Sequence, residues 1–359
     1  MNRFTHGGNI YDAPAPHGEW MDFSANINPL GLSESVREAI EGGIPNLIHY
    51  PDPAAKELKR AVADHYGAPV ESIVLGNGGA ELFYVLFHAL RPKRLLLPIP
   101  SFSEYERAAL SAGTEISYVR LREEDSFALP EDDLIADMRA GDCLLVGNPN
   151  NPTGNLVGVG VWERLLRAAE GKDVLVVADE SFMDFREDAA DYAARTLAGQ
   201  SRHLIVVQSM TKFFALPGLR LGFAVADPET AWRLEAAKDP WNVNLLAQRA
   251  GVAALSDDAF RKMTLAWLRE ERSFLFGAFR EMSDLKAYEP TVNFILLRLG
   301  TSLGRAADFC ARMREQGILL RDCSNYPGLD DTFVRVAVKM RAENEKLLKT
   351  FRHAWRAKP

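Results

Sequence analysis

The chain has 359 residues, of which 47% are hydrophobic and 25% are charged, and its formal net charge is −7. This is the mixture of an ordinary globular protein of about two domains, so a disordered or collagen-like chain is excluded. Proteins that bind nucleic acids usually carry a basic balance, and the acidic charge disfavours that class. It does not exclude an anionic small molecule, because a binding site needs only a few local cations.

The three cysteines, Cys143, Cys310 and Cys323, are too few and too scattered for a disulfide framework or a zinc motif, and we expect no metal site. The N-terminal residues MNRFTHGGNIYDAP contain no apolar signal core. No run approaches the ~18 apolar residues that are needed to cross a bilayer. The sequence therefore predicts a cytoplasmic protein of enzyme size, without a membrane or nucleic-acid partner.

The first 35 residues read as irregular, and a helix is predicted over 53–66, where Leu58, Val62 and Ala63 fall on one face. Short apolar runs then alternate with amphipathic segments, which favours an α/β doubly wound fold. Most of these runs are continuously apolar, as is typical of parallel strands that are buried on both faces. The runs are 72–76, 94–98, 116–121, 143–148, 174–179, 204–209 and 221–226.

The pattern changes after Pro240, where a long helical region, interrupted near Ser256, precedes a mixture of strands and helices. Strands are predicted at 292–299, 317–323 and 333–339, and helices at 245–282, at 302–316 and at the C-terminus. We therefore expect an N-terminal arm (1–35) that joins the small domain, a large domain (36–240) and a small C-terminal α+β domain (241–359).

Ligands of open α/β sheets bind beyond the carboxyl ends of the strands, so the loops after the strands are candidates for a site. Five such loops in succession are polar or rich in glycine, which indicates a constructed site. They are GNGGAE (76–81), PSFSEYE (100–106), GNPNNPTG (147–154), ADESF (178–182) and SMTKFFALPGLRLG (209–222).

Lys212 follows one of these strands and is flanked by apolar and hydroxyl-bearing residues rather than by charges. Most lysines are solvated surface residues. An amine in such surroundings, however, can have a lowered pKa and can attack a carbonyl to form a Schiff base. Arg220, eight residues later, offers a guanidinium that suits a phosphate group.

Asp179 ends the most apolar strand, where it could cap a helix, pair with a buried cation or keep a pyridine nitrogen protonated. GNGGAE opens a helix whose backbone N–H groups could cradle a phosphate, although many turns before helices are rich in glycine. NPNNPTG is more specific, and it predicts that Asn151 donates its amide to an oxygen of a cofactor. Phe102 could stack on a ring, although a lone phenylalanine is more often a core residue.

NPNNPTG, the strand that ends at Asp179 and the S-x-T-K segment followed by Arg220 together resemble fold-type I pyridoxal-phosphate enzymes of the histidinol-phosphate aminotransferase branch. The resemblance covers essentially the whole chain, in order. It implies the α/β fold-type I transferase fold, with a mostly parallel seven-stranded sheet in the large domain and a small α+β domain. It also implies pyridoxal 5′-phosphate (PLP) as the cofactor and a homodimer with shared active sites.

By this resemblance, Lys212 would hold the cofactor as a Schiff base and shuttle protons, and Asp179 would pair with the ring nitrogen. Asn151 would contact the 3-oxygen of the ring, and Phe102 would stack on the ring. Tyr50 would reach the phosphate of the cofactor in the partner subunit. The cofactor phosphate would otherwise be bound by Gly79, Ala80, Ser209 and Arg220.

One position departs from the aminotransferase branch, which usually carries a tyrosine where this chain has Phe182. HGGN (6–9), DFSANINPLG (22–31) and RDCSNYPGL (321–329) shift the resemblance toward the threonine-phosphate decarboxylases of cobalamin biosynthesis, which also carry phenylalanine at that position. This resemblance assigns Arg335 to the substrate carboxylate. It assigns His6, Gly7 and Arg321 mainly to the substrate phosphate. The implied substrate site comprises His6, Gly7, Asn26, Asn151, Arg321 and Arg335.

The implied reaction is the decarboxylation of L-threonine O-3-phosphate to (R)-1-aminopropan-2-yl phosphate and CO2 by a PLP-dependent carbon–carbon lyase. A histidinol-phosphate (or related amino acid) aminotransferase is one alternative. A decarboxylase of phosphoserine is another, because one methyl group gives only about 1–3 kcal/mol of discrimination. A non-catalytic ligand sensor on this fold would not need Lys212 beside Asp179, Asn151 and Arg220.

Overall fold

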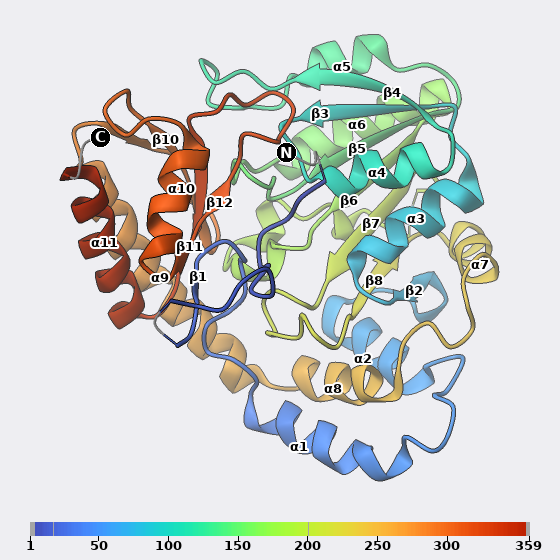
Figure 1. Cartoon of the computed structure of the whole chain (residues 1–359). Coiled ribbons are helices and arrows are strands. Elements are labelled where there is room, and N and C mark those ends of the chain that lie inside the picture. Colours follow the sequence, from blue (N-terminus) through green and yellow to red (C-terminus); the bar gives the residue numbers. More distant parts are fainter. Residues whose placement is uncertain (1–3, 17, 200, 357–359) are drawn as a thin grey trace.

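The structure is a computed structural model, and it describes residues 4–16, 18–199 and 201–356. A wide twisted sheet with helices packed around it forms the larger part of the molecule, and a smaller part of helices and short strands lies beside it (Figure 1). None of the helices within the described ranges combines the length and apolar character needed to cross a membrane.

The large sheet has seven strands in the order β2-β8-β7-β6-β5-β3-β4. β8 runs antiparallel to both of its neighbours, and the other neighbouring pairs are parallel. This confirms the predicted mostly parallel seven-stranded sheet. Its strands are β2 (Ile73–Gly76), β3 (Arg94–Ile99), β4 (Glu115–Arg120), β5 (Asp142–Gly147), β6 (Leu175–Asp179), β7 (Leu204–Ser209) and β8 (Gly222–Val225).

The central strands are mostly apolar, with polar residues only near their ends, because both faces of the sheet are covered. In β5, Cys143 and Leu145 join the hydrophobic cluster on one face, whereas Leu144 and Val146 join the cluster on the other. All six residues of β5 are buried, but the edge strand β4 is partly exposed. The apolar runs in the sequence therefore correspond to strands that are buried on both faces, as was expected.

The first 255 residues contain a series of helices, and local signals set both ends of α2. α2 begins at Lys56, three residues later than predicted, because Asp52 accepts hydrogen bonds from the backbone N–H groups of Ala54 and Lys56 and forms a turn there. It ends at Tyr66, and the following Gly67 caps it with a φ of 69°. These helices are α1 (Glu34–Gly43), α2 (Lys56–Tyr66), α3 (Gly79–Leu90), α4 (Ser103–Ser111), α5 (Glu131–Asp137), α6 (Val159–Lys172), α7 (Pro228–Ala236) and α8 (Leu245–Leu255). Short 3-10 turns lie at Ile44–Asn46, Val70–Ser72, Met183–Phe185, Ala189–Asp191 and Ala194–Thr196.

The smaller part contains an antiparallel sheet in the order β12-β13-β10-β9. The strand predicted over 317–323 is in fact two strands in different sheets: β11 pairs with β1, and β12 pairs with β13. The predicted irregular N-terminal segment therefore contains one short strand. The elements are β1 (Met21–Asp22), α9 (Asp258–Arg280), β9 (Leu285–Ala287), β10 (Phe294–Leu299), α10 (Ala306–Glu315), β11 (Ile318–Leu319), β12 (Arg321–Asp322), β13 (Phe333–Ala337) and α11 (Arg341–Arg356).

The division of the chain at residues 35 and 240 stays a prediction. The pairing of β1 with β11 favours it, since that pairing joins the N-terminal segment to the smaller part. α8 belongs to the C-terminal segment in this division, yet it packs against α1 and α2 beside the large sheet (Figure 1).

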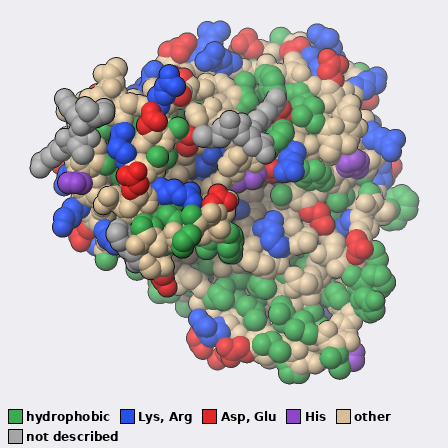
Figure 2. Space-filling view, viewed as in Figure 1, with side chains coloured by type: hydrophobic (Ala, Val, Ile, Leu, Met, Phe, Trp, Pro, Cys, Tyr) green, Lys and Arg blue, Asp and Glu red, His purple; other side chains and the backbone are tan. Residues whose placement is uncertain are grey.

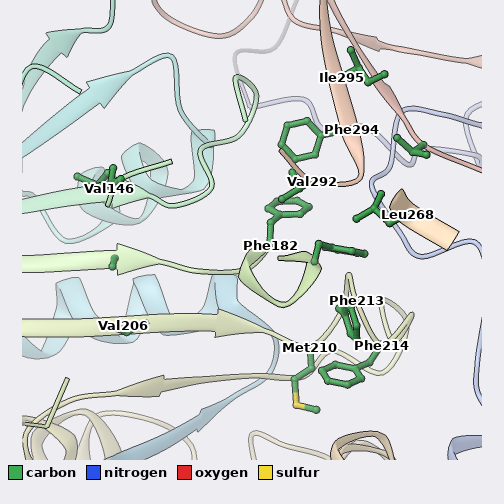
Figure 3. Close-up of a cluster of buried hydrophobic side chains, with 14 of the residues drawn as sticks. Val146, Phe182, Val206, Met210, Phe213, Phe214, Leu268, Val292, Phe294 and Ile295 are labelled. Carbon is green, nitrogen blue, oxygen red and sulfur yellow. The ribbon is translucent and has the colours of Figure 1, made fainter. Parts of the chain in front are cut away.

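One hydrophobic cluster continues from the large sheet into the smaller part. Val146 and Val206 contribute to it from β5 and β7, and Phe294 and Ile295 contribute from β10 (Figure 3). Phe182, at the end of the β6 loop, packs edge-on against Phe294 with ring centroids 5.1 Å apart. The two parts are therefore joined by buried apolar contacts directly beside the loops that follow the parallel strands.

Candidate functional site

A cavity of about 740 Å³ opens at the carboxyl ends of the parallel strands, and residues of the smaller part complete its wall. All five loops singled out from the sequence contribute to its lining. The face shown in Figure 2 is hollowed near its centre, with basic side chains and a histidine around the hollow. The cavity lining contains five Lys and Arg side chains but only three carboxylates, although the chain as a whole is acidic. The basic residues are Arg107, Lys212, Arg220, Arg321 and Arg335, and the acidic residues are Asp22, Glu104 and Asp179.

Lys212 lies on the loop after β7, and its Nζ atom donates a hydrogen bond of 2.6 Å to Thr211. Burial lowers the pKa of its ammonium group from 10.5 to about 8. The negative charge of Asp179 opposes this shift, and the positive charges of Arg220 and Arg335 add to it. An amine with this pKa is partly neutral near pH 8, which is the state that a nucleophile requires.

Asp179 is held at the end of β6 by three hydrogen bonds. One carboxylate oxygen accepts from the backbone N–H and the hydroxyl of Ser181, at 2.9 and 2.5 Å. The other accepts from the Tyr105 hydroxyl at 2.5 Å. Burial raises the pKa of Asp179 in spite of these donors and of Lys212. A protonated pyridine nitrogen is a cation of the kind that would offset this burial and keep the carboxylate ionised.

The N-terminus of α3, directly after β2, forms part of the cavity wall. Gly79 and Ala80, the first residues of this helix, line the cavity together with Ser209 and Arg220. Gly78 has a φ of 82°, and a Cβ atom there would lie only 2.3 Å from the guanidinium of Arg220. Helix N-termini bind anions through their free N–H groups, and here an arginine lies beside one. The four predicted phosphate-binding residues are thus brought together.

The NPNNPTG loop is fixed by its other asparagines. The Asn148 amide donates to the backbone oxygens of Val157 and Tyr192, and the Asn150 amide donates to Pro100 O and to Thr153. Both side chains are buried. These bonds hold the loop in place after β5.

Asn151, in contrast, lines the cavity, and its Oδ1 atom accepts hydrogen bonds from Arg335 and from Tyr326. This arrangement directs its amide N–H groups to a further acceptor, as the prediction of a contact to a cofactor oxygen requires.

Arg321 and Arg335 lie directly opposite each other in the antiparallel pair β12–β13, and each is only 5% exposed. Arg335 donates to Asn151 and, at 2.8 Å, to the backbone oxygen of Ser24, but its buried Nε atom has no hydrogen-bond partner among the described residues. Neither guanidinium forms an ion pair with a carboxylate within the described part of the chain. Two adjacent buried cations of this kind favour an anionic ligand.

The remaining predicted substrate residues also reach the cavity. His6 and Gly7 line it from the N-terminal arm, and the ring of His6 lies 5.4 Å from that of Phe102. Asn26 is buried, and its Oδ1 atom has no hydrogen-bond partner among the described residues. Phe102 lines the cavity at the start of α4, where the prediction places a ring-stacking residue.

Tyr50 is the one predicted site residue that lies outside this cavity. It is 79% exposed, and its ring packs on that of Trp241 with centroids 4.8 Å apart. Tyr50 therefore does not line the cavity of its own chain, and its role toward a partner subunit stays a prediction.

Sequence reasoning missed Tyr105 and Tyr326. Tyr105 follows Phe102, the N-cap of α4, by three residues, and the two rings contact each other edge-on with centroids 5.5 Å apart. That spacing within PSFSEYE was the available signal. Tyr326 contacts Asn151 and lies under the guanidinium of Arg321, 4.9 Å from its ring centroid, and no local pattern in RDCSNYPGL indicates this contact.

The sequence model of the aminotransferase class I and II family matches residues 18–351, and the chain belongs to this family. It is 37% identical to the threonine-phosphate decarboxylase of Salmonella typhimurium, over 97% of this chain and 96% of that protein. The crystal structure of the L-threonine-O-3-phosphate decarboxylase of Porphyromonas gingivalis matches with a TM-score of 0.81 and 28% identity, over 92% of this chain and 98% of that one. The crystal structure of the histidinol-phosphate aminotransferase of Clostridium acetobutylicum matches with a TM-score of 0.87 and 30% identity, over 93% of this chain and 98% of that one.

Enzymes of this family use PLP, and this chain is a PLP enzyme. The cavity fits that cofactor. It offers an amine of lowered pKa, a buried carboxylate, and a cradle at Gly78 that a side chain would fill. The residues that could hold the group are Gly79, Ala80, Phe102, Asn151, Asp179, Ser209, Lys212 and Arg220.

The pKa of Lys212 can be tested on cofactor-free protein by competitive acetylation, in which the Lys212 peptide is quantified by mass spectrometry. The rate of acetylation of Lys212 should rise with pH around a midpoint near 8, because only the free amine reacts and burial disfavours the ammonium form. Asp179→Asn should lower the midpoint, since the carboxylate stabilises the ammonium. Arg335→Gln should raise it, since a repelling charge is removed. A midpoint near 10.5 in the unaltered protein would contradict the assignment.

Proposed function

We propose that this protein is a threonine-phosphate decarboxylase, which converts L-threonine O-3-phosphate to (R)-1-aminopropan-2-yl phosphate and CO2. The observation that carries the proposal is the buried pair Arg321 and Arg335, opposed across β12–β13 in the cavity that holds Lys212. Like charges at opposed strand positions destabilise a sheet, and two anionic groups on one ligand would offset the repulsion. An amino acid that carries a carboxylate and a phosphate supplies both.

Arg335 takes the carboxylate of the substrate in this proposal. Asn151 and the backbone oxygen of Ser24 hold its guanidinium from two sides, and its Nε remains as a buried donor. A guanidinium that is fixed in this way orients a carboxylate specifically, because two parallel N–H groups match two oxygens. Asn26 lines the same cavity, and its buried amide oxygen, which has no partner among the described residues, is a further polar group for the substrate.

Arg321, His6 and Gly7 take the phosphate. Arg321 is held by the backbone oxygen of Asp322 and by Asn325, and its side chain stacks on Tyr326. Both arginines are therefore positioned before a substrate arrives, and less conformational entropy is lost when it binds.

When bound, PLP withdraws electrons from the carbon that carries the amino group, so that one of its bonds can break. Asp179 holds a proton on the ring nitrogen, and Asn151 and Phe102 orient the ring. In the overall reaction the bond to the carboxylate breaks, CO2 leaves and a proton takes its place. The Nζ atom of Lys212, with a pKa of about 8, is the group that can deliver this proton.

The choice between decarboxylation and amino transfer rests on orientation, because the residues that hold the carboxylate and the phosphate decide which bond is activated. The similarity to threonine-phosphate decarboxylases at 37% identity favours decarboxylation over the activity of histidinol-phosphate aminotransferases, which match at 26–32%. Phe182 favours it too, since the tyrosine hydroxyl of the aminotransferase branch is missing.

The proposal includes a homodimer and a cytoplasmic location, which the sequence favours. Five large apolar side chains form an exposed patch near α1 and α8, where hydrophobic residues gather on the surface (Figure 2). They are Ile44, Leu47, Ile48, Tyr50 and Trp241. Contiguous apolar surface of this kind marks an interface, and Tyr50 within it would reach the cofactor of the partner subunit.

Product analysis tests the reaction. Phosphothreonine should give the amine phosphate and CO2 without any 2-oxo acid, and Lys212→Ala should abolish the product. Phosphoserine should react less well, within the ~10–200-fold that one methyl group allows. A requirement for 2-oxoglutarate, with histidinol phosphate as the amino donor, would instead identify an aminotransferase.

The two arginines should differ in their kinetic effect. Arg321→Ala should raise the KM for phosphothreonine on the order of 10²-fold, since the removal of one partner from a buried charge pair costs ~2–5 kcal/mol of binding free energy. Arg335→Ala should lower kcat as well, because the carboxylate loses its orientation. Steady-state kinetics of both variants, with inorganic phosphate as a competitor, separates the effect on phosphate binding from the effect on kcat. Equal effects on KM alone would contradict the assignment of the carboxylate to Arg335.

The dimer can be tested by light scattering after size-exclusion chromatography. The unaltered protein should have twice the mass of one chain, and Ile48→Glu should shift it toward the monomer, because a charge is then buried in an apolar interface. Leu110→Glu changes an exposed apolar residue on α4 and is the control. A monomeric unaltered protein would overturn the proposal.

A further inference from the structure

The N-terminal arm joins the two parts of the molecule across the cavity. The carbonyl oxygen of Thr5 accepts hydrogen bonds from Arg321 and Asn325 of the smaller part, at 2.8 and 3.0 Å. The next residue, His6, lies 2.7 Å through its Nε2 atom from a carboxylate oxygen of Glu104, in the first turn of α4. Two consecutive residues therefore contact opposite walls of the same cavity.

The glycines after His6 allow the arm to lie this close. A Cβ atom on Gly7 would be 2.2 Å from the backbone oxygen of Ser24, so any larger residue would push the arm away. Gly8 has a φ of 83°, and its N–H donates to the Ser24 hydroxyl at 2.7 Å. Ser24 is itself fixed by Asp22. The HGGN motif is thus explained by the way the arm docks.

Glu104 is the anchor of the arm on the large sheet side. It is 8% exposed, and its second oxygen accepts a hydrogen bond of 3.0 Å from Tyr84. Burial raises the pKa of Glu104, but the hydrogen bonds from His6 and Tyr84 outweigh this effect and lower it. Arg107 lies 3.5 Å from the same carboxylate and stacks over the ring of Phe4 in the arm. An ionised carboxylate in the wall of an anion site is unfavourable unless other groups compensate its charge. Arg107 supplies a cation beside it, and His6 and Tyr84 contact it within hydrogen-bond distance.

We propose that Glu104 is a positioning residue, which holds His6 and with it the whole arm over the phosphate group of the substrate. A direct contact of Glu104 with an anionic substrate would be repulsive, and its contact with His6 gives the carboxylate an indirect role at this place. The inference deepens the proposed function and rests on it for the identity of the substrate. The docking of the arm through Glu104 can be measured without substrate.

A double-mutant cycle tests the proposal. Glu104→Ala and His6→Ala should each raise the KM for phosphothreonine on the order of tenfold, with a smaller effect on kcat, as expected when a charge-assisted hydrogen bond to the substrate loses its orientation. The double variant should be no worse than the more severe single variant, because Glu104 acts through His6. Glu104→Gln, which keeps an acceptor oxygen for His6, should recover part of the loss.

Glu106→Gln is the matched control. Glu106 lies on the same helix and is as buried as Glu104, but it accepts from Tyr118 and does not line the cavity. Its substitution should leave the KM unchanged. An equal rise in KM for this variant would show a general effect on α4 and would overturn the proposal.

Hydrogen–deuterium exchange of the holoenzyme separates this inference from the proposed function. Peptides that cover residues 4–12 should exchange several-fold faster in Glu104→Ala than in the unaltered protein or in Glu106→Gln, because the arm has lost its anchor. Unchanged exchange, or additive effects in the cycle, would refute the role of Glu104. If the unaltered protein fails to decarboxylate phosphothreonine, the proposed function falls, and the exchange experiment still decides whether Glu104 anchors the arm.

Discussion

The opposition of Arg321 and Arg335 across β12–β13 is the constraint around which the site is arranged. Two guanidiniums at such a position repel each other, and burial removes the water that would screen them. Each is held in place by neutral oxygens, from Ser24, Asn151 and Asn325 and from the backbone of the arm. Neutral acceptors fix the cations without cancelling their charge. The positive potential therefore remains available to a ligand, within a chain whose net charge is −7.

The same low-dielectric surroundings set the proton affinities of the groups that face these arginines. Burial destabilises the charged forms of both Lys212 and Asp179, so the pKa of the amine falls and that of the carboxyl rises. The two groups partly offset each other, and Tyr105 and Ser181 stabilise the carboxylate further. A cofactor that reacts with the amine and presents a cationic ring to the carboxylate relieves both costs at once.

The sequence predicted the large sheet well because a strand that is buried on both faces has a continuous apolar run in its own sequence. It also located the cavity, since the loops after parallel strands meet at one edge. It could not separate β11 from β12, because GILLRDC (317–323) reads as one continuous segment and only the pairing partners, β1 and β13, distinguish its two halves. The contacts of Tyr105 with Asp179, and of Glu104 with His6, join residues 74 and 98 positions apart, which no local pattern records. The roles of His6 and Arg321 came from resemblance to a family rather than from spacing.

Phe182 links the proposed choice of reaction to the packing of the molecule. Its ring lines the cavity and packs edge-on against Phe294, in the cluster that joins the large sheet to the smaller part. Phe294 also contacts Arg335, whose guanidinium lies 5.4 Å from the centroid of the Phe294 ring. A hydroxyl at position 182 would have to be satisfied within this apolar contact, at a cost of roughly 1–3 kcal/mol if it were not. Phe182 and the arginine that we propose for the carboxylate are therefore parts of one packing arrangement.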